Sequence, residues 1–349
     1  LRLQASFEMG KLGRMLGLGK KGKIGLTVDK PSYVAGEIVR GTIYVDIHEP
    51  IECDVLKVTG KEKVEFTKIR REFKEGGEQE VHYDPVEREK EFFKQKLVIS
   101  AMNGQAYAPG RYMYPFEYQL PAQLPGAFKL TGYSEGDVKE LSAKIKYKFK
   151  ATLDVDGFFA SDLKADCDLV VHERNFQSLT ASEDSVTQDV KFLCCFSRGT
   201  CQLAVAMDKS VYFAGETAQI QCNISNNSQV EISTMRCRLY QDVKLQLSKG
   251  NYHTFTRQMS QNEFPGVPAG STLQQPQPLM LSADRGGFLN PSTTGELIAC
   301  AYRIDVECDI PWCPDVVLHL PVAIIAPELP HPGSSWVPES TEGFVEPRM

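Results

Sequence analysis

Cysteine and histidine are the residue types in this sequence with the widest capacity for chemistry. Its ten cysteines and six histidines would suit a metal site, or a nucleophile with its base. Their spacing favours neither, because no HExxH, CxxC, GxSxG or P-loop pattern occurs. The sequence therefore predicts no catalytic, cofactor or metal site. The histidines are scattered at His48, His82, His172, His253, His319 and His331.

One vicinal pair, Cys194-Cys195, stands between Phe192 and Phe196 and has two interpretations. The thiols could be acylated, or they could be buried where two domains meet, and we expect burial. Three other cysteines fall within apolar alternations, where a thiol behaves as a small hydrophobic group. These are Cys222, Cys300 and Cys308.

A repeated turn shows how the chain is organised. Residues 29–37 read DKPSYVAGE and residues 208–216 read DKSVYFAGE, with six of nine positions identical at an offset of 179 residues. Apolar residues alternate on both sides of each copy, which predicts strand, glycine turn and strand. An offset this long predicts two domains of one kind in tandem. We assign a structural role to the shared positions, which are Asp29, Tyr33, Gly36 and Glu37 with Asp208, Tyr212, Gly215 and Glu216.

Long period-two segments define the fold class. Residues 144–155 place apolar side chains on one face and four lysines on the other, and residues 298–310 alternate in the same way late in the second half. No segment has a sustained helical period. The sequence predicts an all-β chain of two tandem immunoglobulin-like antiparallel β-sandwiches. The expected divisions are a basic leader (1–23), an N-domain (24–175), a linker (176–198), a C-domain (199–327) and a flexible Pro-rich tail (328–349).

Charge limits the partners. With 39 basic and 45 acidic residues, the net charge of −6 argues against nucleic acid as a partner. The sequence has no apolar run long enough to span a membrane and no secretory signal, so we expect a cytoplasmic protein, peripheral at plasma membrane or endosomes.

Two basic groups are candidate contact regions. For protein partners or anions we consider the strand residues Lys144, Lys146, Lys148 and Lys150, with Lys68, Arg70 and Arg71 from the charged stretch 68–91. That stretch is expected to be a mobile hairpin tip or long connection. For anionic lipid we consider the leader residues Lys20, Lys21 and Lys23. The alternative in each case is an ordinary solvated surface.

The order of several motifs resembles the arrestins. Residues 110–128 are similar to the G-x-x-x-x-P-F-x-x-x-L-P…L-P-x-x-F signature of arrestin N-domains, and residues 145–147 to the I-x-Y strand after it. Residues 191–196 resemble a segment of the α-arrestins, the arrestin domain-containing proteins. Residues 295–306 and 320–322 look like the end of an arrestin C-domain. Both repeats carry Ala-Gly-Glu, whereas receptor-binding arrestins have Asp-His after the tyrosine of the first.

The resemblance implies a non-enzymatic adaptor in endocytosis and protein sorting, without a cofactor. Its implied partners are cytoplasmic tails of membrane proteins and the trafficking or ubiquitination machinery. The tail lacks the PPxY motif by which α-arrestins bind WW domains. Two alternatives remain: a retromer-like coat subunit, expected to form a stable stoichiometric complex, and a secreted macroglobulin-type module, expected to contain disulfides.

Overall fold

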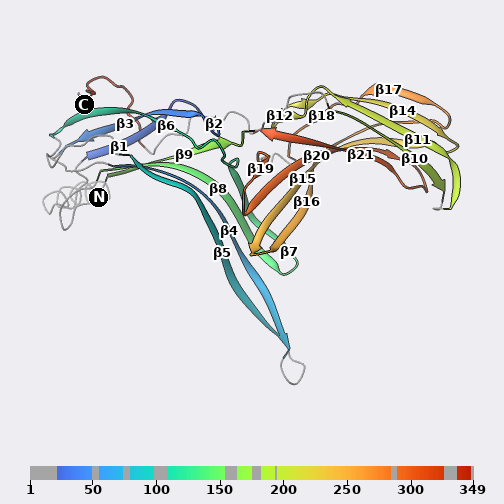
Figure 1. Ribbon diagram of the computed structural model, residues 1–349, viewed down its shortest axis with the longest axis horizontal. Coiled ribbons are helices and arrows are strands. Elements are labelled where there is room, and N and C mark those ends of the chain that lie inside the picture. The colour runs from blue at the N-terminus through green and yellow to red at the C-terminus, as the bar shows by residue number, and fades with distance from the viewer. Residues whose placement is uncertain are drawn as a thin grey trace, which may run out of the picture.

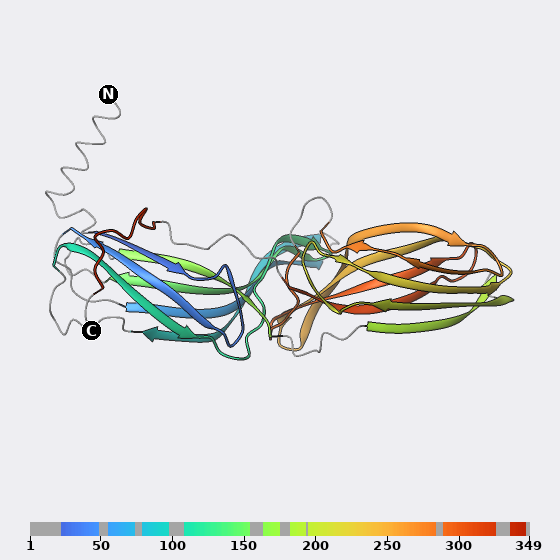
Figure 2. The same ribbon diagram turned by 90° about the horizontal axis from the view of Figure 1, so that it is seen from above.

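The computed structural model describes residues 22–48, 55–73, 79–97, 108–153, 163–174, 182–192, 195–283, 289–325 and 336–346, with backbone alone at 55–73, 79–80, 97 and 182. Every regular element in these ranges is a β-strand. The strands form two lobes that lie end to end, with β1–β9 in one and β10–β21 in the other (Figure 1). Figure 2 shows both lobes along one line, seen from above. The predicted all-β fold of two tandem sandwiches is confirmed.

Two sheets make up the N-domain sandwich. One has the strand order β1-β3-β6, and the other β2-β9-β8-β4-β5 with β7 also paired to β8. All these pairs are antiparallel except β2 with β9. The strands are β1 (Gly22–Val28), β2 (Ser32–Val34), β3 (Ile38–Ile47), β4 (Val55–Phe73), β5 (Gln79–Leu97), β6 (Gly110–Gln119), β7 (Phe128–Glu135), β8 (Val138–Leu153) and β9 (Leu163–His172).

Aromatic side chains join these two sheets. Phe149 on β8 has no exposed surface and meets Phe116 and Tyr118 of β6 edge-on, with ring centroids 5.2 and 5.8 Å apart. Tyr147, also fully buried, donates its hydroxyl to the Pro125 carbonyl at 2.6 Å. The alternation predicted for residues 144–155 therefore holds in β8, whose apolar side chains face the core.

The C-domain sandwich repeats this plan. Its sheets have the orders β10-β11-β14-β17 and β12-β21-β20-β15-β16, with β19 beside β20, and a small β13-β18 pair. The strands are β10 (Ser182–Phe192), β11 (Phe196–Met207), β12 (Val211–Phe213), β13 (Thr217–Ala218), β14 (Ile220–Ser228), β15 (Ile232–Ser248), β16 (Asn251–Val267), β17 (Thr272–Pro276), β18 (Leu279–Met280), β19 (Thr293–Thr294), β20 (Ile298–Asp309) and β21 (Val316–Ile325). Strand β20 takes the place of β8, with buried Ile304 and Val306 on its inner face.

Part of the predicted linker is a strand. Residues 182–192 form β10, which pairs with β11 from Ser182 opposite Met207 to Phe192 opposite Phe196. Val190 on β10 is 1 % exposed. The polar composition of residues 182–192 does not indicate a strand, because an edge strand buries few of its side chains and the rest face water.

The charged stretch 68–91 belongs to a hairpin, one of the two forms predicted for it, and its described part consists of long paired strands. Strands β4 and β5 pair antiparallel from Leu56 opposite Leu97 to Phe73 opposite Gln79. The resulting hairpin projects away from both lobes (Figure 1). The main-chain ladder gives this hairpin its regular structure although its sequence is charged on both faces.

Candidate functional site

The repeated turns have matching geometry. In the first, the Tyr33 hydroxyl donates to Asp29 Oδ1 at 2.5 Å, and Glu37 Oε2 accepts from the Val34 amide at 3.0 Å. In the second, Tyr212 donates to Asp208 Oδ1 at 3.2 Å, and Glu216 accepts from the Phe213 amide at 2.8 Å. The two glycines have φ of 83° and 87°, which an L side chain rarely adopts.

Each repeat is more than the opening hairpin predicted from its sequence. Within it, a short strand leaves the hairpin and pairs parallel with the opposite sheet, β2 with β9 and β12 with β21. Both tyrosine rings are 1 % exposed, which places them in the core. The Ala35 amide donates to the His172 carbonyl and the Ala214 amide to the Ile325 carbonyl, both at 2.9 Å, so each repeat ties two sheets together.

The lysine face of β8 is partly neutralised. Lys146 lies 2.8 Å from Asp168, and Lys148 lies 3.1 Å from Asp166, both on β9. Lys144 is exposed, and Lys150 is half-buried beside β4. Ion pairing neutralises two of the four lysines, and the register places Lys57, Lys61 and Lys63 of β4 opposite Lys150, Lys146 and Lys144, so the face keeps a net positive charge.

The structure does not gather the other predicted basic residues into that face. Lys68 on β4 lies opposite Val138 at the start of β8, and Arg70 and Arg71 lie beyond the β8 pairing, opposite His82 and Val81 of β5. Their side chains lie outside the described part. Among the leader residues, Lys20 and Lys21 also lie outside it. Lys23 is an exposed residue of β1, with its ammonium 5.8 Å from the centroid of the Trp336 ring.

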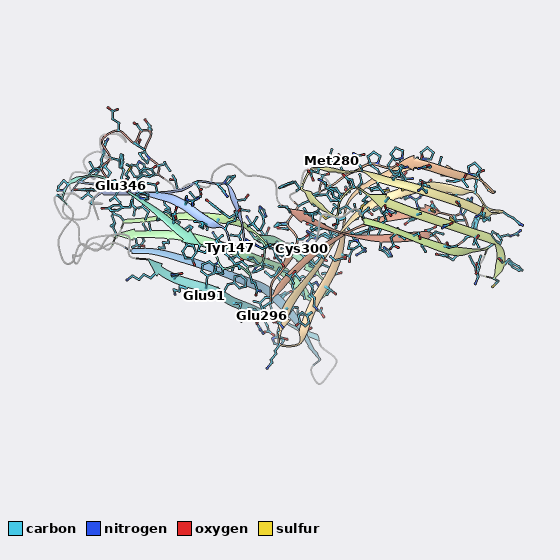
Figure 3. The ribbon with its side chains drawn as sticks, turned by 45° about the horizontal axis from the view of Figure 1, so that its top comes forward. Glu91, Tyr147, Met280, Glu296, Cys300 and Glu346 are labelled. Carbon is cyan, nitrogen blue, oxygen red and sulfur yellow. The ribbon has the colours of Figure 1, made fainter. Side chains whose placement is uncertain are left out.

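Residues 336–346, in the predicted flexible tail, lie on the N-domain. The Met113 amide donates to the Val345 carbonyl and the Val345 amide donates to the Arg111 carbonyl, both at 3.0 Å. These bonds add a short extended segment to the open edge of β6. Glu346, at the end of the described tail, lies on the N-terminal lobe (Figure 3).

Aromatic side chains fix the tail segment. The Phe344 ring meets Tyr44 edge-on at 5.6 Å, and the Arg111 guanidinium lies over Phe344 at 5.8 Å. Trp336 packs so closely on β1 that a Cβ at Gly25 would lie 2.4 Å from the Trp336 carbonyl oxygen. The prediction of an unpacked tail is wrong for this segment, because two aromatic residues bury surface that the Pro-rich composition concealed.

The two lobes meet through polar and aromatic contacts. Asn290 Oδ1 accepts from the Lys129 amide at 2.9 Å, and Glu173 Oε2 accepts from the Thr294 amide at 2.6 Å. The Tyr133 ring stacks on Phe255 at 4.1 Å, with the Arg257 guanidinium over it. These residues carried no recognisable sequence signal, since each pairing joins positions far apart along the chain.

A groove of about 590 Å³ follows this junction, lined by residues 172–174, 291–294, 300–302 and 321–325. Labelled Cys300 and Glu296 show where the junction lies (Figure 3). His172 at its wall is 6 % exposed, and its Nδ1 has no hydrogen-bond partner in the described part of the chain. Burial lowers the pKa of His172, and the nearby Glu37 carboxylate opposes this shift.

We expect stability to fall with acid through His172. A His with a lowered folded pKa binds its proton better when unfolded, so its contribution is present above the unfolded pKa of about 6.5 and is lost as pH falls toward the folded pKa. Across that window the slope is at most about 1.4 kcal/mol per pH unit. Glu37, Glu173 and Arg174 face the same region.

Denaturant unfolding at pH 7.5 and pH 5.5 measures the effect. His172→Gln should reduce the loss of stability on acidification. His48→Gln, at a side chain 54 % exposed, should leave that loss unchanged. Equal pH dependence in both variants and the parent would contradict the assignment.

The vicinal cysteine prediction is only partly tested. Cys195 is exposed in the turn between β10 and β11, so the expectation of burial is wrong for this residue, whereas Cys194 lies outside the described part. Phe196 beside it is 63 % exposed. The turn lies at the end of the C-domain hairpin, not between the domains, because β10 pairs with β11.

Two searches of the described residues gave negative results. Among the described side chains, no group of three or more His, Cys, Asp or Glu residues could hold a metal ion. Within the same ranges, no helix has the length and apolar character needed to cross a membrane.

Comparisons with known proteins agree with the two-domain fold. Residues 23–174 match the model of the arrestin (or S-antigen) N-terminal domain, and residues 197–329 match that of the C-terminal domain. Arrestin domain-containing protein A of Dictyostelium discoideum is 29% identical over 334 residues, covering 94% of this chain and 54% of that protein. Arrestin domain-containing protein B of the same organism is 23% identical over 312 residues, covering 87% and 46%.

A visual relative matches less of the chain. Arrestin, lateral eye, of Limulus polyphemus is 24% identical over 178 residues, 48% of this chain and 41% of its own length. The chain spans about half the length of the curated relatives it matches. Both domain models match in chain order and together cover most of the two sandwiches, so the chain belongs to the arrestin family, as a member of the arrestin domain-containing, or α-arrestin, type.

Proposed function

We propose that this protein is a non-enzymatic cytoplasmic adaptor that binds cytoplasmic tails of membrane proteins, or trafficking machinery, in protein sorting. Family membership supports the adaptor class over the coat-subunit and secreted-module alternatives. The single observation that carries the proposal is the outer edge of β6, where Val345 of the tail forms main-chain hydrogen bonds with Met113 and Arg111.

Edge-strand addition suits an adaptor that binds several cargoes. Main-chain hydrogen bonds give affinity without demanding one sequence, and pockets for alternate side chains give selectivity. Here the Met113 amide and the Arg111 carbonyl face outward from β6, while the Phe344 ring lies between Tyr44 and Arg111. We propose that a cargo peptide with an aromatic residue uses the same edge when residues 336–346 leave it.

Proximity labelling in cells tests the adaptor role, using the full chain and a variant that lacks residues 336–349. Membrane and trafficking proteins should be enriched with both, and more strongly with the truncated variant, because its β6 edge is open. If neither the full chain nor the truncated variant enriches membrane and trafficking proteins, the adaptor proposal fails.

A matched pair of substitutions in the truncated chain tests the edge itself. Met113→Pro removes the outward amide that the Val345 carbonyl accepts from, and Met113→Ala retains it. Labelling should fall several-fold in the proline variant and persist in the alanine variant. Equal labelling by the two variants would show that binding does not use this edge.

A further inference from the structure

The outer face of the larger N-domain sheet carries a row of lysines. Lys57 on β4 pairs with Lys150 on β8 and with Lys96 on β5, so three lysines lie directly opposite one another across three strands. These strands run side by side in the N-terminal lobe, with β5 at the edge of the sheet (Figure 1). Like charges in this arrangement destabilise a sheet. An anionic partner would relieve a cost that the fold by itself retains.

A second row lies on the same face, closer to the C-domain. The register places Lys63 on β4 opposite Lys144 on β8, and Lys144 opposite Lys129 on β7. Between the two rows, Lys61 on β4 lies opposite Lys146 on β8. We refer to the outer face of β7, β8, β4 and β5 at these positions as the basic sheet face.

Carboxylates compensate only part of this charge. Asp166 and Asp168 on β9 form ion pairs with Lys146 and Lys148. By contrast, Lys94, Lys96 and Lys144 are exposed, and none of them has an ion pair with a carboxylate in the described part of the chain.

The excess charge is greatest at one end of the basic sheet face. Glu89 and Glu91 of β5 lie opposite Lys63 and Lys61, on the side that continues into the β4–β5 hairpin. At the other end, the row through Lys57 meets only lysine on β8 and β5. Positive charge is therefore concentrated on the lobe and not along the projecting hairpin.

The corresponding face of the C-domain is balanced in charge. On β20, which takes the place of β8, Glu307 and Asp309 accept from Arg236 of β15 at 2.9 and 2.6 Å. Farther along the same strand, Asp305 accepts from Arg303 at 3.1 Å. The two sandwiches share one plan but differ in charge on this face. The rows of lysines are thus a feature of the N-domain sequence and not a requirement of the fold.

We propose that the basic sheet face docks on a membrane surface that exposes anionic lipid headgroups. Strands in a sheet lie about 4.8 Å apart, and outward side chains along one strand repeat at about 6.8 Å. These spacings are shorter than the Debye length of about 8 Å at physiological ionic strength, so the potentials of neighbouring lysines add. Clustered lysines bind anionic lipid surfaces through such a summed potential.

The residue types on this face favour a membrane over an acidic peptide. The outward positions 144–150 of β8 and 57–63 of β4 hold lysine and threonine alone. Lysine is a compact point charge, whereas arginine is the residue that binds carboxylate or phosphate with two parallel hydrogen bonds. These positions also offer no aromatic side chain of the kind that anchors protein interfaces. An open sheet face with distributed charge suits a laterally mobile layer of headgroups.

Vesicle sedimentation with the full chain tests the proposal. The probes are vesicles of phosphatidylcholine alone and vesicles that contain about 30 mol % phosphatidylserine. We expect binding to the anionic vesicles only, and loss of that binding in about 0.5 M NaCl, where charges are screened within a few ångströms. Since the readout is lipid binding by the isolated protein, its failure is distinct from failure of the adaptor proposal, which rests on β6.

A triple substitution tests the face itself. Lys94→Gln, Lys96→Gln and Lys150→Gln together should weaken binding to the anionic vesicles about a hundredfold, at about fivefold for each lysine. If the triple variant unfolds at lower urea concentration than the parent, the exposed pair Lys94→Gln and Lys96→Gln makes the same test, with an expected loss of about twentyfold.

A matched control removes the same charge from the other domain. Lys191, Lys244 and Lys249 are exposed in the C-domain, and their replacement by glutamine should change vesicle binding by less than about threefold. The leader lysines are present in both triple variants, so the difference between the two reports the sheet face. Equal binding by the two triple variants, or equal binding of the parent to both kinds of vesicle, would overturn the proposal. It would also be overturned if the face variant lost affinity for polyglutamate but kept its affinity for anionic vesicles, since the face would then serve an acidic protein partner.

Discussion

Replacing Tyr33 by alanine is expected to destabilise the N-domain by about 3–5 kcal/mol, and Tyr212→Ala should cost the C-domain a similar amount. Each ring is 1 % exposed, so truncation leaves a cavity where two sheets meet. The Tyr33 hydroxyl also donates to Asp29, and the Tyr212 hydroxyl lies 2.8 Å from the Lys209 carbonyl and 3.2 Å from Asp208, so truncation removes these hydrogen bonds as well. Equilibrium unfolding in urea measures the effect. Each domain is followed by its own spectroscopic signal, which does not depend on tryptophan.

Phenylalanine variants divide this cost into packing and hydrogen bonding. Tyr33→Phe keeps the ring and loses a hydrogen bond to a carboxylate, worth about 1.5–3 kcal/mol. Tyr212→Phe loses a hydroxyl whose nearer acceptor is the neutral Lys209 carbonyl, at 2.8 Å against 3.2 Å for Asp208, so it should cost less. If either alanine variant were as stable as its phenylalanine counterpart, the repeat would not have the structural role we assign to it.

Removing Glu307 should also be strongly destabilising, at about 2–3 kcal/mol for Glu307→Ala. The carboxylate accepts from Arg236 at 2.9 Å and from Arg238, and its side chain is 12 % exposed. Without this carboxylate, the half-buried guanidinium groups of Arg236 and Arg238 would have less negative charge beside them. A fully buried pair broken on one side costs about 3–5 kcal/mol, and partial exposure of the arginines reduces that figure.

Two variants bracket this effect. Glu307→Gln keeps the side-chain size and an acceptor oxygen, and should cost about half as much as alanine. Glu263→Ala removes a partner of the same Arg236, at 3.3 Å, from a side chain 56 % exposed, and should cost less than about 1 kcal/mol. Equal unfolding free energies for Glu307→Ala and Glu263→Ala would show that burial of the charge does not determine its contribution.

Much of the fold could be predicted from local patterns. The alternation around Tyr147 and Phe149 identified the inner face of β8, and the two copies of the repeat identified two domains of one kind. The prediction was reliable there because side chains of a half-buried strand alternate between core and water. It failed for β10, where few residues are buried and the pattern is correspondingly weak.

The strands could be predicted from the sequence, whereas the ion pairs between them could not. The lysines of β8 do face outward, yet Asp166 and Asp168 on β9 neutralise two of them. The sequence does not show how β8 and β9 align with each other. The pairing of these aspartates with the lysines therefore could not be predicted. Trp336 and Phe344 were visible in the tail, but nothing local indicated that they bind the N-domain.

The sequence by itself determined which side chains face a core, the all-β class, the twofold repetition and, through ordered motifs, the resemblance to arrestins. Only the tertiary structure decided which edge residues 336–346 occupy and how the lobes meet. The physical reason is the range of the interactions. Periodicity records how each residue meets water or core, whereas these contacts join residues far apart along the chain, whose separation is set only when the sheets pack.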